Sequence, residues 1–201
     1  MNEAVVRVLE RPRVYLAWQR PFASTKFAPI WRHNDRSTIR RVLDIGCGPG
    51  TNSAEFKGLD YLGVDLNPAY IDHARRRYGA HFEVADVRTD RVPRKGLYDF
   101  VLVNSLLHHI DDDAVSALLA DIRDYVSDDG HVHVIELDLP KERGLARFLA
   151  RADRGDYARS LAKWRGLLAQ HFDEVVFEPF PVPARGPMLW SMVYFKGRPR
   201  R

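Results

Sequence analysis

Three glycines, Gly46, Gly48 and Gly50, stand two residues apart directly after the short apolar, β-branched run of residues 41–45. The run is typical of a buried parallel strand, and Asp44 lies at its end, just before the turn. Glycine adopts backbone angles that other residues avoid, and it lets a ligand come close to the main chain. A strand, a glycine turn and the start of a helix together form a cradle for an adenosine cofactor.

The spacing of the glycines excludes two other kinds of cofactor loop. A dinucleotide-binding fingerprint needs its third glycine one place later, where this chain has Thr51. A phosphate-cradling loop would end in Gly-Lys followed by Ser or Thr, and the sequence has no such ending. Gly-x-Gly-x-Gly behind Leu43-Asp44 instead resembles motif I of the class I S-adenosylmethionine-dependent methyltransferases.

Three further predicted strands carry a polar residue at or near their ends: residues 61–64 are followed by Asp65, 82–87 include Asp86, and 98–105 include Asn104. In open α/β sheets, ligands bind at the carboxyl ends of the strands. Asp65 follows the first glycine by about 20 residues, where such folds place an acid on the ribose hydroxyls. The resemblance implies that Asp86 contacts the adenine amine.

The resemblance covers residues 38–138 closely and the remainder in outline. It implies S-adenosylmethionine as the cofactor and S-adenosylhomocysteine as its product. No metal is expected, because Asn104 stands where metal-dependent catechol enzymes have an acid, although Glu136 and Asp138 lie near the fifth strand. The expected cofactor-binding residues are Asp44, Gly46, Cys47, Gly48, Gly50, Asp65, Leu66, Asp86, Val87, Asn104 and Ser105.

Alternating strands and helices predict an α/β protein with a three-layer α/β/α sandwich. The resemblance implies a Rossmann-like, seven-stranded, mostly parallel sheet in the order 3-2-1-4-5-7-6, with an antiparallel last strand. Helical spacing and end signals predict helices over 68–78, with Asn67 as N-cap, and over 111–126. The remaining expected elements are a strand at 131–137, one or two helices within 141–172, and strands at 175–180 and 189–195.

Two regions stand apart from the predicted cofactor fold. Residues 1–35 are rich in aromatic side chains, and Pro12, Pro21 and Pro29 are expected to break them into short helical pieces. We expect this segment to form a helical lid, and residues 36–201 to form the S-adenosylmethionine-binding domain with a helical insertion near 141–172. The lid and the insertion would roof the methyl group and choose its acceptor.

Two adjacent histidines, His108 and His109, follow the fourth strand and are the candidate catalytic residues. An imidazole near the methyl group could act as a general base, since its pKa suits neutral pH. The alternative is that both are polar loop residues, one of which caps the helix beginning at Asp111.

Five residues are candidates for contact with the acceptor. Arg154, Tyr157 and Arg159 could clamp a carboxylate or phosphate, or belong to a salt-bridged helix surface with Asp153 and Asp156. Tyr15 and Gln19 come from the N-terminal segment. The aromatic side chains of that segment could contact the sulfonium by cation–π attraction, or pack in the core; they are Tyr15, Trp18, Phe22 and Phe27.

The residues after the fourth strand narrow the class of acceptor. They read Asn104-Ser105-Leu106-Leu107, without the Pro-Pro that base-amine methyltransferases carry there, and without the Pro-Cys of cytosine-ring enzymes. A small-molecule O-, N- or C-methyltransferase is therefore expected. The alternatives are a cofactor-binding protein without transferase activity, and an RNA or protein methyltransferase.

Composition agrees with one globular domain in a reducing compartment. The chain has 201 residues, 45% hydrophobic and 29% charged, and no apolar run approaches the ~20 residues of a membrane span. Residues 1–3 do not resemble the start of a signal peptide, and Cys47 is the only cysteine, so a cytoplasmic protein is expected. Four of the last six residues are basic and account for the net charge of +4, so neither a nucleic-acid nor a membrane partner is expected.

Overall fold

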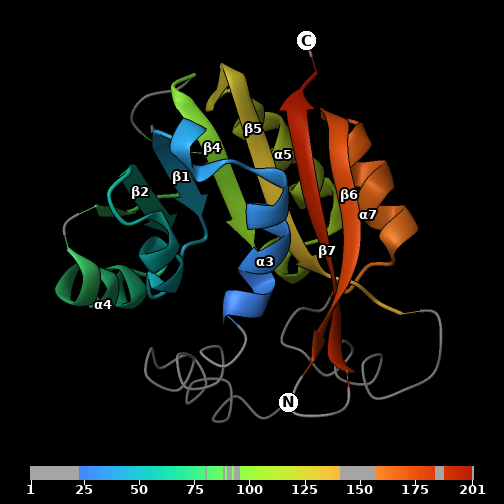
Figure 1. The fold of residues 1–201 in the computed structure, drawn as a ribbon, viewed down its shortest axis with the longest axis horizontal. Coiled ribbons are helices and arrows are strands. Elements are labelled where there is room, and N and C mark those ends of the chain that lie inside the picture. The colour runs from blue at the N-terminus through green and yellow to red at the C-terminus, as the bar shows by residue number, and fades with distance from the viewer. Residues whose placement is uncertain are drawn as a thin grey trace.

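Apolar strands followed by polar turns assemble into one sheet of seven strands in the order β3-β2-β1-β4-β5-β7-β6, as the resemblance implied (Figure 1). The computed structural model describes residues 23–79, 81–87, 89, 92, 96–140, 157–183 and 188–200. The strands are β1 (Arg41–Ile45), β2 (Asp60–Asp65), β3 (Phe82–Val84), β4 (Tyr98–Asn104), β5 (Val126–Leu137), β6 (Phe172–Pro183) and β7 (Met188–Pro199).

The direction of pairing places the polar strand ends on one edge of the sheet. β1 pairs in parallel with β2 and β4, β2 with β3, and β4 with β5. β7 runs antiparallel to both β5 and β6, which confirms the expected antiparallel last strand. The carboxyl ends of β1, β2 and β4 therefore meet at the lower edge in Figure 1.

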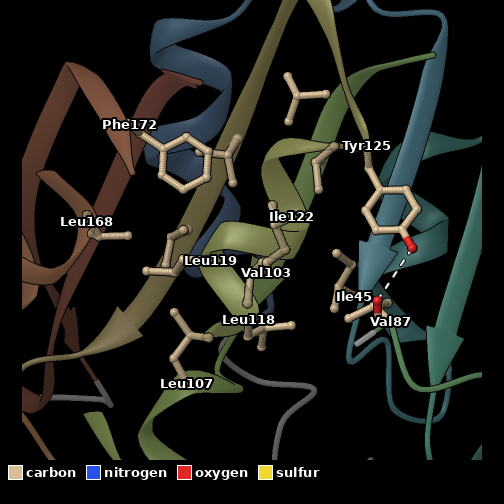
Figure 2. Packing of buried hydrophobic residues seen from close by; sticks show 14 of the residues in the cluster. Ile45, Val87, Val103, Leu107, Leu118, Leu119, Ile122, Tyr125, Leu168 and Phe172 are labelled. Atoms are coloured by element: carbon tan, nitrogen blue, oxygen red, sulfur yellow. Dashed lines mark hydrogen bonds between the residues drawn. The ribbon is translucent and has the colours of Figure 1, made fainter. Parts of the chain in front are cut away.

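Helices cover both faces of the sheet and complete the three layers. α3 (Ala23–His33) and α4 (Pro68–Tyr78) pack on one face, where Phe27, Ile30 and Ile71 are buried in one cluster. α5 (Asp112–Arg123) and α7 (Leu161–Ala169) pack on the other face in a second cluster, part of which Figure 2 shows. Each fully buried large apolar side chain contributes about 1.5–3 kcal/mol relative to an exposed one.

Side-chain caps explain where these helices begin. The Asn67 side chain accepts a hydrogen bond from the Ala69 N–H, and Pro68 occupies the first turn of α4, as expected. Asp111 itself caps α5 by accepting from the Ala114 N–H, so neither histidine is the N-cap residue. Ser160 caps α7 in the same way through the Lys163 N–H.

The structure corrects several boundaries. Pro29 lies inside α3 and does not break it, because the flanking Phe27 and Ile30 are buried and their packing holds the helix across the missing N–H. The helix that starts after the glycine turn is a 3-10 helix, η3 (Thr51–Phe56). β5, β6 and β7 are each 12 residues long, longer than the sequence pattern predicted.

The two regions expected to roof the site are described only in part. Within 1–35, α3 is a core helix whose Phe27 and Ile30 are 2% and 0% exposed, and residues 1–22 lie outside the described residues. Within 141–172, α7 packs against the sheet, and residues 141–156 lie outside the described residues. The lid stays a prediction for residues 1–22. Among the described residues, no helix is both long and apolar enough to cross a membrane.

Candidate active site

The glycine turn has a backbone that requires glycine at three positions. Gly46, Gly48 and Gly50 have φ angles of +71°, +55° and +84°, all in the left-handed region. A Cβ atom on Gly50 would lie 2.7 Å from the Cβ of Ala74 in α4, whereas a Cβ on Gly48 would meet nothing within 4 Å. Gly50 therefore packs the turn against α4, and Gly48 borders open space at the carboxyl edge.

Asp65, at the end of β2, holds this turn from the side. Its Oδ2 accepts the Gly48 N–H at 2.9 Å and its Oδ1 accepts the Asn67 N–H at 2.8 Å. Burial raises the pKa of Asp65, while the two backbone donors act to lower it. Since each carboxylate oxygen can accept more than one hydrogen bond, Asp65 can also accept from a ligand hydroxyl.

Asp44 is the buried acid beneath the turn. It accepts hydrogen bonds from the Tyr61 hydroxyl at 2.7 Å and from the Asn52 side chain at 3.1 Å. Burial raises the pKa of Asp44 to about 6. The Asn104 side-chain amide donates in turn to Asn52 Oδ1 at 3.3 Å, so Asn52 links the ends of β1 and β4. Asn52 lies in η3 and Tyr61 lies inside β2, so the pattern of polar residues after strand ends does not identify either of them.

Ser105 continues this polar chain toward α3. It is the one non-glycine residue with positive φ, +56°, in the described part of the chain. Its hydroxyl donates to Asn104 Oδ1 at 3.0 Å and accepts from Lys26 Nζ at 3.3 Å. Lys26 is only 9% exposed, so α3 brings a buried cation to the carboxyl end of β4. No pattern in the sequence points to Lys26, which precedes Ser105 by 79 residues.

The two histidines occupy opposite environments. His108 is buried and its Nδ1 lies 2.7 Å from Glu136 Oε2, whereas the His109 side chain is exposed. The two rings lie 4.2 Å apart between centroids. Glu136 Oε1 also accepts the Leu106 and Leu107 N–H groups at 2.8 and 2.6 Å. Burial acts to raise the pKa of Glu136, but His108 and the backbone donors lower it overall.

Of the residues that could clamp a carboxylate or phosphate of the acceptor, Arg159 binds other parts of the protein. The Arg159 guanidinium is buried and donates to Asp112 Oδ1 at 2.7 Å and to the Leu107 and Ile110 carbonyls at 2.9 and 2.7 Å. Tyr157 is 42% exposed, and its N–H donates to the His108 carbonyl at 3.1 Å. Arg159 thus binds the protein around the histidine turn η4 (Leu107–His109). Arg154, Tyr15 and Gln19 lie outside the described residues.

The remaining predicted cofactor residues divide into exposed and buried ones. Leu66 is 62% exposed beside Asp65, and Asp86 is partly exposed beyond β3. Val87 is 8% exposed in the core, and its carbonyl accepts the Tyr125 hydroxyl at 3.4 Å (Figure 2). Burial raises the pKa of the Cys47 thiol, which fits a packing role and not a nucleophile.

An adenosine cofactor fits the donor set of this edge. Gly48 borders open space, Asp65 offers carboxylate oxygens, and Leu66 offers an exposed apolar surface next to them. In the described ranges, no three His, Cys, Asp or Glu side chains are grouped so that they could hold a metal ion.

Comparison with known proteins agrees with this geometry. A family model described as a methyltransferase domain matches residues 10–178. The chain therefore belongs to this family of enzymes, within the class I S-adenosylmethionine-dependent methyltransferases. Its fold is similar to that of an S-adenosylmethionine-dependent methyltransferase from Methanosarcina mazei, with a TM-score of 0.71 and 17% identity over 87% of this chain and 98% of that chain.

Curated relatives match only part of this chain. It is 29% identical over 101 residues to the ubiquinone biosynthesis O-methyltransferase of Acinetobacter baylyi, covering 46% of this chain and 42% of that protein. It is 37% identical over 76 residues to the trans-aconitate 2-methyltransferase of Methylobacterium nodulans, covering 34% and 30%. The matched segment therefore spans less than half the length of either relative.

Proposed function

We propose that this chain transfers a methyl group from S-adenosylmethionine to a small-molecule acceptor. The observation that carries the proposal is the left-handed glycine turn, fixed by the hydrogen bond from the Gly48 N–H to Asp65. When bound, S-adenosylmethionine supplies a methyl group already activated by its sulfonium. The chain has to bind it, orient it and hold an acceptor in line with the carbon–sulfur bond.

Each cofactor role follows from the position of a residue at the carboxyl edge. Asp65 would accept the ribose hydroxyls, and Leu66 and Asp86 would contact the adenine. Gly46, Gly48 and Cys47 would border the cofactor with their backbone, while Gly50 packs the turn on α4. Asn104 and Ser105 would lie nearest the methyl group, and Asp44 would orient the turn and Asn104 through Asn52.

The acceptor class is supported by the relatives. One relative is named as an O-methyltransferase of ubiquinone biosynthesis, and the other as a methyltransferase that acts on trans-aconitate. A small acceptor that is methylated on oxygen is therefore our proposal for this chain.

A proton has to be removed only when the acceptor enters in its protonated form. For such an acceptor His109 is the proposed base, because it is exposed and its ring lies against that of His108. His108 would be a positioning residue, since Glu136 holds its Nδ1 and the backbone of the turn. An H109Q variant should lose the alkaline rise in kcat without losing cofactor affinity.

Calorimetry with S-adenosylmethionine and S-adenosylhomocysteine tests the cofactor assignment. Wild-type protein should bind both, NADH should not bind, and Asp65→Ala should weaken binding by about 1–3 kcal/mol through lost charge-assisted hydrogen bonds. Unchanged affinity in D65A would contradict the ribose assignment.

Production of S-adenosylhomocysteine in the presence of a metabolite extract then tests the transferase activity. Binding without turnover would favour the alternative of a cofactor-binding protein. Turnover on RNA or protein, and not on the extract, would favour the other alternative.

A further inference from the structure

We propose that Arg159 is a positioning residue for the methyl transfer, because it holds the backbone turn that carries the proposed base, His109. The inference rests on the proposed function, in which His109 takes the proton of an acceptor hydroxyl. The acceptor oxygen bonds to the methyl carbon, and the electron pair of the breaking carbon–sulfur bond stays on sulfur. Arg159 precedes α7 and is 5% exposed. Burying a charge costs free energy unless it is paired and hydrogen-bonded, so the partners of Arg159 identify what it holds.

The guanidinium of Arg159 binds the carbonyl side of the η4 turn. Its Nη1 donates to the Leu107 carbonyl at 2.9 Å and its Nη2 donates to the Ile110 carbonyl at 2.7 Å, so its two arms bracket the histidines. The N–H of Tyr157, in the same short segment, donates to the His108 carbonyl at 3.1 Å. This segment therefore binds successive carbonyls in and directly after the turn.

Glu136, at the end of β5, binds the N–H side of the same turn. Its buried carboxylate accepts the Leu106 and Leu107 N–H groups at 2.8 and 2.6 Å, and it lies 2.7 Å from His108 Nδ1. An ionised carboxylate only accepts hydrogen bonds and a guanidinium only donates them, so each charge can bind one side of the turn and not the other. We therefore expect the turn to be fixed only when both charges are in place.

The η4 turn lies beside the glycine turn that is proposed to hold the cofactor. A Cβ atom on Gly46 would lie 2.9 Å from Leu106 Cδ2, so the Leu106 side chain packs directly on that glycine. The position of His109 relative to the methyl group then depends on the backbone between them. Because a misplacement of about 1 Å can lower a rate ~100-fold, loosening the turn by removing Arg159 should lower kcat.

Two cations that share one partner provide matched variants. Arg159 Nε and Lys163 Nζ both bind the Asp112 carboxylate, at 2.7 and 2.6 Å, but of the two only Arg159 also binds carbonyls of the turn. Arg159→Gln removes the cation from the turn, and Arg159→Lys keeps the charge but not the planar fork of donors. Lys163→Gln removes an ion pair with the same acid and leaves the turn unchanged.

The experiment measures formation of S-adenosylhomocysteine with the metabolite extract, over a dilution series and from neutral to alkaline pH. Circular dichroism first shows that each variant is folded. We expect R159Q to lower kcat by ~10- to 100-fold and to lose the alkaline rise. The extract dilution that gives half the maximal rate, and the affinity for S-adenosylmethionine, should change by less than about twofold. R159K should recover part of the loss, and K163Q should match wild type.

The double variant R159Q/H109Q separates positioning from a general loss of stability. If Arg159 acts through His109, the double variant should be no slower than H109Q, because the base that Arg159 positions is already absent. If R159Q does not fold, R159K takes its place in this comparison.

Four results would overturn the inference and leave the proposed methyl transfer standing. They are a wild-type kcat in R159Q, a wild-type kcat in H109Q, losses that multiply in the double variant, and a loss in K163Q equal to that in R159Q. Absence of turnover in the wild-type protein would instead contradict the proposed function itself.

Discussion

Three glycines with the same backbone strain but different surroundings allow folding and cofactor binding to be separated. Gly48, Gly50 and Gly58 all have positive φ, at +55°, +84° and +91°. An alanine Cβ would meet nothing within 4 Å at Gly48 and Gly58, but it would lie 2.7 Å from Ala74 and 2.9 Å from Phe82 at Gly50. Each of the three Gly→Ala changes therefore carries the strain of a left-handed backbone, and only Gly50→Ala adds a steric clash.

The expected magnitudes follow from these contacts. Left-handed alanine costs roughly 1–2 kcal/mol, so G48A and G58A should lower the free energy of unfolding by about that amount. Overpacking adds about 1–3 kcal/mol, so G50A should cost clearly more than the other two. G48A should in addition weaken S-adenosylmethionine binding, because its methyl group enters the space proposed for the cofactor, and Gly48→Val should abolish binding in a folded protein.

Urea denaturation followed by circular dichroism measures the first effect, and calorimetry with S-adenosylmethionine measures the second. G58A is the control for strain without a ligand nearby. If G48A binds the cofactor as tightly as G58A, the open space at Gly48 does not face the ligand. If G50A is no less stable than G58A, the contact of the turn with α4 is not tight in solution.

Two further predictions concern buried charges. Burial raises the pKa of Asp44 from 3.8 to about 6, so the folded state holds this proton more tightly than the unfolded state does. The stability that Asp44 contributes is therefore present below pH 4 and is lost as the pH rises through 6. At 1.36 kcal/mol per pH unit, the free energy of unfolding should fall by ~3 kcal/mol. Urea titrations of Asp44→Asn across this pH range should not show that fall. Arg159→Ala should lower the free energy of unfolding by about 2 kcal/mol or more, because the Leu107 and Ile110 carbonyls lose their buried donor. Arg165→Ala removes an exposed ion pair with Glu174 and should cost less than about 1 kcal/mol, and equal losses in the two variants would contradict the role of Arg159.

Local patterns were sufficient to predict the positions of the strands and the cap of α4, and the family resemblance supplied the order of the strands. The cap of α5 is Asp111 and not one of the histidines that the sequence analysis considered. The polar strand ends were found because each immediately follows an apolar run. Strand lengths in the β6–β7 hairpin were underestimated, since their ends are decided by pairing with each other and not by their own composition. Pro29 was misjudged because the packing around it depends on distant residues.

The candidate site was harder to predict than the fold, because it depends on contacts between residues that are far apart in the sequence. His108 and His109 are identical in type and adjacent, yet Glu136, 28 residues after His108, is what pairs with the buried one. The Lys26–Ser105 contact joins the first described helix to the residue that follows β4. No spacing rule predicts such a pair, because it exists only once α3 has packed across the sheet.

The position of β7 has a consequence for synthesis of the protein on the ribosome. β7 is the last strand in sequence, yet it lies between β5 and β6 in the sheet. While the nascent chain grows, β5 can pair with β4 on one side, but its other edge stays unpaired, next to buried residues such as Val132 and Val134. An apolar unpaired edge invites association with other chains. The sheet can close only after β7 has emerged, and the β6–β7 hairpin, whose pairing is local, can then dock on β5 as a unit.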